Sequence, residues 1–177
     1  MGVIGKWRAA RKRKRRAANY LRALLTPPDA TDVAWLTTLT GDRAVAEREL
    51  TFARRALGLI VAERDALDDR TASDVARALS DVIGRETRRA VVDTSLWTAR
   101  RKAYTAAMTV RGQPEAPTVR FGRVLLEGAG VGHPSHAALA GAARFVQSTR
   151  TQANETLRAV FGEASLPEDV RPSAIRP

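Results

Sequence analysis

The chain has 177 residues, of which 44% are hydrophobic, and a net charge of +11 at pH 7. This length suffices for one domain with a hydrophobic core, and the absence of cysteine excludes disulfides, thiolate metal sites and cysteine nucleophiles. No apolar run approaches the roughly 18 to 20 residues that a membrane-spanning helix requires, so we expect no transmembrane helix.

The positive charge is concentrated at one end of the sequence. Residues 1–26 contain nine Lys or Arg and no acidic residue, whereas residues 27–177 contain 21 Lys or Arg against 19 Asp or Glu. Nine of the eleven net charges therefore belong to residues 1–26. Such a concentration directs this segment toward an anionic partner, which is a membrane surface, a nucleic acid or an acidic protein face.

Residues 1–26 also have the pattern of a basic amphipathic helix. No Gly or Pro interrupts residues 6–26, and Pro27-Pro28 ends the helix because proline lacks an amide hydrogen. Apolar residues recur at helical spacing near both ends, so we expect both ends to anchor the helix while the basic middle lies on an anionic surface. The alternative is a solvated, partly disordered basic tail. The predicted membrane- or partner-binding residues are Val3, Ile4, Trp7, Arg11, Lys12, Arg13, Lys14, Arg15, Arg16, Leu21, Leu24 and Leu25.

Two helices are predicted next. Residues 29–41 form a short helix capped by Thr31 or Asp32 and closed by Gly41. Asp42 then caps a helix that runs to about residue 69 and carries one continuous apolar face.

A capping-box pattern at residues 71–74 predicts one long helix that ends at Gly112 and forms an αα-hairpin with its predecessor. Gly84 weakens it locally, by about 1 kcal/mol relative to Ala. The helix carries a possible second basic surface, which is more typical of a solvated or partner-facing helix than of a reader of DNA grooves. Its residues are Arg88, Arg89, Arg100, Arg101 and Lys102.

Residues 112–134 are rich in Gly and Pro, which predicts an irregular loop with a short strand at residues 119–126. A final helix is expected from about Ser135 to Glu163, followed by an extended tail over residues 164–177. The sequence thus predicts an all-α bundle in three parts: an anchoring helix (1–26), a helical domain (29–163) and a tail (164–177). We expect residues 42–163 to fold without residues 1–26.

Candidate chemistry is sparse. Glycines 128, 130 and 132 follow an apolar run, but His133 stands where the dinucleotide fingerprint needs its third Gly. His133 and His136 are the only histidines and are the candidate metal ligands, but Glu127 is the only nearby carboxylate. We therefore expect no metal site, no cofactor, no small-molecule substrate and no enzymatic activity.

The leading hypothesis is a non-catalytic accessory subunit, peripheral to the cytoplasmic face of a membrane or of a membrane-embedded complex, for example a respiratory or photosynthetic one. Its basic helix would bind anionic lipid or acidic subunits of the complex. The alternative is a nucleic-acid-associated protein, bound to a ribosome or nucleoid, whose basic helix binds phosphates.

Overall fold

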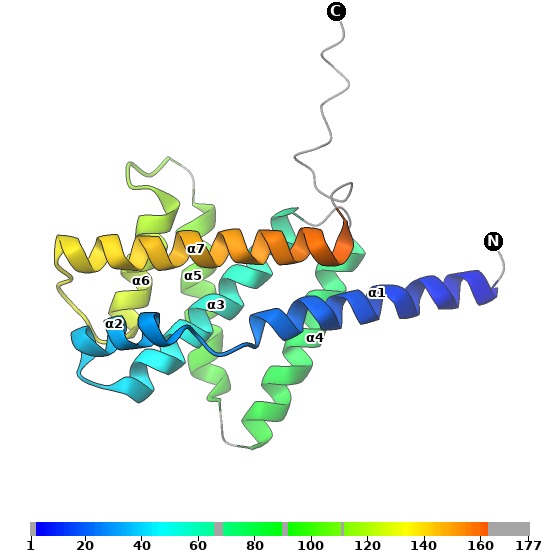
Figure 1. Ribbon diagram of the computed structural model, residues 1–177, viewed down its shortest axis with the longest axis horizontal. Coiled ribbons are helices and arrows are strands. Elements are labelled where there is room, and N and C mark those ends of the chain that lie inside the picture. Colours follow the sequence, from blue (N-terminus) through cyan, green and yellow to red (C-terminus); the bar gives the residue numbers. More distant parts are fainter. Residues whose placement is uncertain (1–2, 66–68, 90–91, 111, 163–177) are drawn as a thin grey trace, which may run out of the picture.

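The computed structural model describes residues 3–65, 69–89, 92–110 and 112–162. Within these ranges the protein is all-α, as predicted, with seven helices and no strand (Figure 1). The helices are α1 (Val3–Leu24), α2 (Ala30–Thr40), α3 (Arg43–Asp65), α4 (Asp69–Arg88), α5 (Thr94–Thr109), α6 (Pro117–Gly128) and α7 (His136–Phe161). The predicted tail, residues 164–177, lies outside the described residues.

Helix α3 is the centre of the bundle and packs against all six other helices. Its residues 55–62 are all buried, because neighbours cover every side of the helix at this point. Small residues allow the closest approaches. A Cβ added at Gly58 would lie 2.4 Å from Leu24 Cδ1 of α1, so any larger residue at this position would displace the Leu24 side chain.

Helix α1 belongs to the bundle over its second half only. Ala17, Tyr20, Leu21 and Leu24 are buried in the core, and α1 packs on α4, α7 and α3. The first half of α1 projects beyond the other helices (Figure 1). The helix before Pro27-Pro28 thus supplies side chains to the same core as the helices that follow these prolines.

The predicted long helix after residue 70 is wrong, because the chain forms α4 and α5 instead. Asp93 begins α5: its carboxylate accepts hydrogen bonds from the backbone N–H groups of Ser95 (2.8 Å) and Leu96 (3.3 Å). Apolar residues continue at helical spacing on both sides of this point, which conceals the break in the sequence. Helix α4 begins at Asp69, so Thr71 lies inside its first turn and does not cap it.

The predicted strand at residues 119–126 is also wrong, because these residues belong to α6. Pro117 lies at the start of α6, where a missing amide hydrogen costs nothing. Phe121 and Leu125, one helical turn apart, are fully buried. Gly122 lets α7 approach, since an added Cβ there would be 2.9 Å from Ala142 Cβ. The Gly/Pro-rich region 112–134 is therefore not a continuous loop.

Most other predicted helix ends are confirmed. Gly41 follows α2 with a φ of 71°, a left-handed conformation that glycine adopts without strain. The Asp42 carboxylate accepts hydrogen bonds at the start of α3, and Ser135 caps α7 by accepting one from Ala138 N–H. The predicted cap of α2 is wrong by two or three residues: Asp29, rather than Thr31 or Asp32, accepts the hydrogen bond there.

Candidate anionic-surface interface on helix α1

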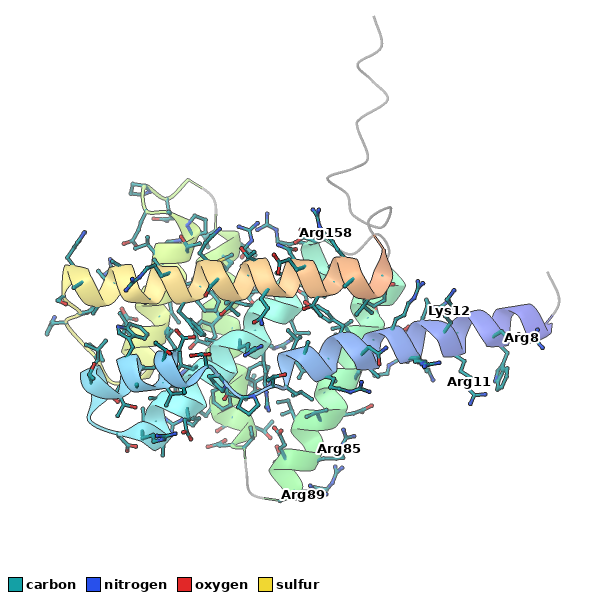
Figure 2. The ribbon with its side chains drawn as sticks, in the orientation of Figure 1. Arg8, Arg11, Lys12, Arg85, Arg89 and Arg158 are labelled. Atoms are coloured by element: carbon teal, nitrogen blue, oxygen red, sulfur yellow. The ribbon has the colours of Figure 1, made fainter. Side chains whose placement is uncertain are left out.

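The projecting half of α1 carries a dense group of exposed cations. Arg8, Arg11 and Lys12 point away from the bundle along this part of the helix (Figure 2). Together with Trp7, Lys14 and Arg15, which are also exposed, they cover an arc of about 160° at 100° per residue. We call these six residues the basic face: Trp7, Arg8, Arg11, Lys12, Lys14 and Arg15. The backbone of Val3 and Ile4 lies in α1, and their side chains fall outside the described part.

The prediction omitted Arg8, although its position carries a signal. Residues 11, 12 and 15 follow Arg8 by three, four and seven positions, which is the spacing of residues on one face of a helix. The predicted set was built on the continuous run of cations at residues 11–16, and Arg8 lies outside that run.

Trp7 is the most exposed large hydrophobic side chain described, with 61% of its surface accessible. The guanidinium carbon of Arg11 lies 5.4 Å from the centroid of the Trp7 ring, which is a cation–π contact. At an exposed site such a contact is worth only about 0.5–1 kcal/mol. It orients the indole on the basic face and leaves most of it open to a partner.

Two of the predicted cations face inward. Arg13 Nε lies 3.6 Å from Asp74 Oδ2 of α4, in a partly buried ion pair, and Arg16 is half-buried. Arg13 thus adds an ion pair to the packing of α1 on α4, while Arg11 and Arg15, its neighbours two positions away, remain exposed. The basic run is therefore divided between holding the helix in place and presenting charge to solvent.

The predicted apolar anchor at the second end of α1 is wrong. Leu21 and Leu24 are buried in the protein's own core, and Leu25 is half-buried against it. These leucines do lie on one face of the helix, but that face packs against α3 and its neighbours rather than a membrane. A stripe of leucines has the same pattern in either case.

The residues of the predicted second basic surface are divided between α4 and α5, and one of them faces inward. Arg88 and Arg89 are exposed at the end of α4, with Arg85 close by (Figure 2), and Arg101 and Lys102 are exposed on α5. Arg100 instead faces inward. Its Nε is 2.8 Å from Glu49 Oε2, and its Nη2 donates to the Gly128 carbonyl oxygen at 2.7 Å.

Glu49 is a buried charge to which no pattern in the sequence points. It has 0% exposed surface in the middle of α3, and its second carboxylate oxygen lies 3.1 Å from Arg48 Nη2. A buried carboxylate with two guanidinium partners is satisfied, and it links α3 to α5.

The candidate metal ligands lie together on the surface. His133 is exposed in the segment before α7, and His136 is the exposed first residue of α7. Within the ranges that the structure describes, no group of three or more His, Cys, Asp or Glu side chains could hold a metal ion.

None of the described helices combines the length and the apolar character needed to cross a membrane. Comparison with known proteins gives no relative: no protein-family model, no curated protein and no solved structure matches this chain.

Proposed function

We propose that this protein is a non-catalytic docking subunit that attaches to an anionic membrane surface through the basic face of α1. The observation that carries this proposal is the exposed Trp7 beside five exposed cations, on a half-helix that projects beyond the bundle. Tryptophan favours the headgroup region of a bilayer, where its ring is partly buried and its N–H still finds acceptors.

The expected binding energy is mostly electrostatic. Each basic residue near an anionic leaflet contributes about 1 kcal/mol, so five cations supply several kcal/mol at low ionic strength. A protein that binds in this way dissociates as salt is raised, except for the part that Trp7 contributes by burying apolar surface. The cytoplasmic leaflet, which carries the anionic lipids, is the surface that fits this chemistry.

The contacts of α1 with α3 and α4 connect the basic face to the bundle. Tyr20 donates a hydrogen bond to the Gly58 carbonyl oxygen of α3, and Arg13 pairs with Asp74 of α4. A membrane that holds the basic face therefore also fixes the orientation of the bundle. This suits an accessory subunit that presents its helices to a membrane-embedded respiratory or photosynthetic complex.

A nucleic-acid partner is the second candidate, and the burial of Leu21 and Leu24 favours it. With those side chains in the core, Trp7 is the one exposed large hydrophobic residue of α1 among the side chains described. The remaining surface is dominated by charge, and arginine, which binds phosphate in a bidentate manner, outnumbers lysine on it.

Vesicle flotation and RNA binding by the same samples test the proposal. The full chain should float with vesicles that contain phosphatidylglycerol and remain behind with pure phosphatidylcholine. Arg11→Gln with Arg15→Gln should reduce flotation at least tenfold, because both side chains are exposed and outside ion pairs of the described residues. Arg43→Gln with Arg144→Gln removes the same charge from α3 and α7 and should change it little.

Trp7→Ala separates the two candidates. On a membrane it should remove the salt-resistant part of binding, so that flotation falls to background at high salt. With RNA alone as the partner, log affinity falls linearly with log salt for the parent protein. Absence of flotation with tight RNA binding would transfer the proposal to nucleic acid, and absence of both would overturn it.

A further inference from the structure

A cavity of about 470 Å³ lies between α4 and α5, and no residue of α1 lines it. The two helices are closest where α4 ends and α5 begins, since Thr87 Oγ1 and Thr94 Oγ1 are 2.7 Å apart. From there they diverge across α3 (Figure 1). The volume falls in the range of about 300–1,000 Å³ that small-ligand sites occupy.

The floor and the rim of this cavity differ in chemistry. The floor is formed by buried apolar side chains from three helices: Leu59, Leu79, Ile83 and Trp97. The rim carries hydroxyl groups and two arginines: Ser80, Thr87, Thr94, Thr98, Arg88 and Arg101. An apolar floor with a few polar groups at its edge is the usual composition of a site that binds an amphipathic molecule.

The two arginines belong to opposite walls. Arg88 comes from α4 and Arg101 from α5, both are exposed, and neither forms an ion pair within the described part of the chain. Like charges that face one cavity repel each other, and an anion placed between them relieves that repulsion. Guanidinium groups bind carboxylate and phosphate oxygens through paired hydrogen bonds.

Gly84 supplies an independent indication that the cavity is kept open. Close neighbours explain other helix glycines, since an added Cβ would lie within 3 Å of Leu24 at Gly58, of Ala142 at Gly122 and of Trp35 at Gly141. At Gly84, which lines the cavity, an added Cβ would meet only Arg88 Nη1, at 3.7 Å. Packing therefore does not require glycine here, although glycine destabilises a helix by about 1 kcal/mol relative to alanine.

We infer that this cavity binds an amphipathic anion, with its apolar chain on Trp97 and Ile83 and its carboxylate or phosphate head between Arg88 and Arg101. The apolar floor accounts for the chain, the two cations account for the head group, and Gly84 leaves room for both. The bound molecule is a ligand, because the cavity lining holds no nucleophile activated by a neighbouring base.

Calorimetric titration of the full chain tests this site with four probes. The two anionic amphiphiles are used below their micelle concentrations. Dodecanoate or dodecyl phosphate should bind with one-to-one stoichiometry, and the better of the two identifies the head group. Dodecanol, which lacks the charge, should bind at least tenfold more weakly, and acetate, which lacks the chain, should not bind. Failure of both anionic amphiphiles to bind, or binding of dodecanol as tight as that of dodecanoate, would overturn the inference.

Amino-acid substitutions test whether the probes bind in this cavity. Gly84→Leu should abolish binding by filling the cavity, whereas Gly84→Ala should raise the melting temperature and confirm that the helix tolerates a side chain there. Arg88→Gln with Arg101→Gln changes only exposed side chains. This variant should bind dodecanoate at least tenfold more weakly and dodecanol with unchanged affinity. Arg11→Gln with Arg15→Gln removes charge from α1 and should leave this binding intact. Loss of binding in the α1 variant instead of the cavity variants would contradict the inference without bearing on membrane docking.

Discussion

The hydroxyl of Tyr20 donates a hydrogen bond of 2.8 Å to the carbonyl oxygen of Gly58, across 38 residues of sequence. Both residues are buried where α1 crosses α3, and burial raises the pKa of the Tyr20 hydroxyl well above its usual value, so it remains a donor at all physiological pH values. Together with the burial of Leu21 and Leu24, this bond holds α1 in one rotation about its own axis. The rotation decides which cations face outward, so the core contact determines the composition of the basic face.

Tyr20→Phe should therefore destabilise the fold by about 1 kcal/mol, the net worth of a typical hydrogen bond. Urea denaturation measures the change. Tyr104→Phe is the matched control, because the Tyr104 hydroxyl is also buried but has no hydrogen-bond partner among the described residues. Its removal should be neutral or stabilising, since an unsatisfied polar group leaves the core. Equal losses in the two variants would show that the bond to Gly58 contributes nothing.

Local signals in the sequence predicted the fold wherever the partners of a residue are near it in the chain. Asp42 and Ser135 cap helices through amides two or three residues away, and Gly41 ends α2 through its own backbone conformation. The break between α4 and α5 had such a signal in Asp93, which was overlooked because the apolar pattern continues past it. For α6, the surrounding Gly and Pro residues concealed a short helix whose apolar face consists of residues about one turn apart, such as Phe121 and Leu125.

The candidate site was predictable in composition but not in orientation. The sequence identifies a basic segment, yet it does not distinguish Arg13, paired with Asp74, from the exposed Arg15. Arg100 and Arg101 pose the same problem on α5, where only one of the two reaches Glu49. These differences depend on the packing of residues far apart in the chain, which a single sequence does not specify.

Truncations should separate the two halves of α1. Deleting residues 1–12 removes much of the basic face and leaves Arg13 and the side chains of α1 that are described as buried, Ala17, Tyr20, Leu21 and Leu24. The melting temperature should therefore change by only a few degrees, while vesicle binding is lost. Deleting residues 1–26 also removes Tyr20, Leu21 and Leu24 from the core. At about 1.5–3 kcal/mol for each large side chain, that loss approaches the total stability of a typical domain. Thermal melts followed by circular dichroism compare the two. A cooperative melt of the longer deletion near that of the full chain would restore the prediction that residues 42–163 fold alone.

The cap of α5 should make stability depend on acidity. Hydrogen bonds from the Ser95 hydroxyl and from the backbone of Leu96 and Ser95 hold the pKa of the Asp93 carboxyl below its ordinary value of 3.8. Because the folded pKa is lower than the unfolded one, the ionised carboxylate stabilises the fold above pH 3.8, and this contribution is lost as the pH falls through the folded pKa. The difference in melting temperature between the parent and Asp93→Asn should therefore shrink between pH 7 and strongly acidic solution. Ser135→Ala removes a cap without a carboxyl and should cost a similar amount at every pH. A constant difference for Asp93→Asn would contradict the assignment.

The buried carboxylate of Glu49 requires its arginine partners for stability. Arg100→Met leaves the buried Glu49 with Arg48 as its one remaining guanidinium partner. Losing the sole partner of a buried charge costs about 3–5 kcal/mol, and because Arg48 still compensates part of the charge, the loss should lie below that range but well above about 0.5 kcal/mol. Arg101→Met, at the exposed neighbouring position, should change stability by about 0.5 kcal/mol or less. The double variant Glu49→Leu with Arg100→Met removes both charges and should recover most of the lost stability, because two apolar side chains of similar volume need no partners. Urea denaturation of the parent, Glu49→Leu, Arg100→Met and the double variant completes the cycle. Additive losses in the double variant would mean that Glu49 and Arg100 stabilise the fold independently, and the link between α3 and α5 would then have to be assigned to packing alone.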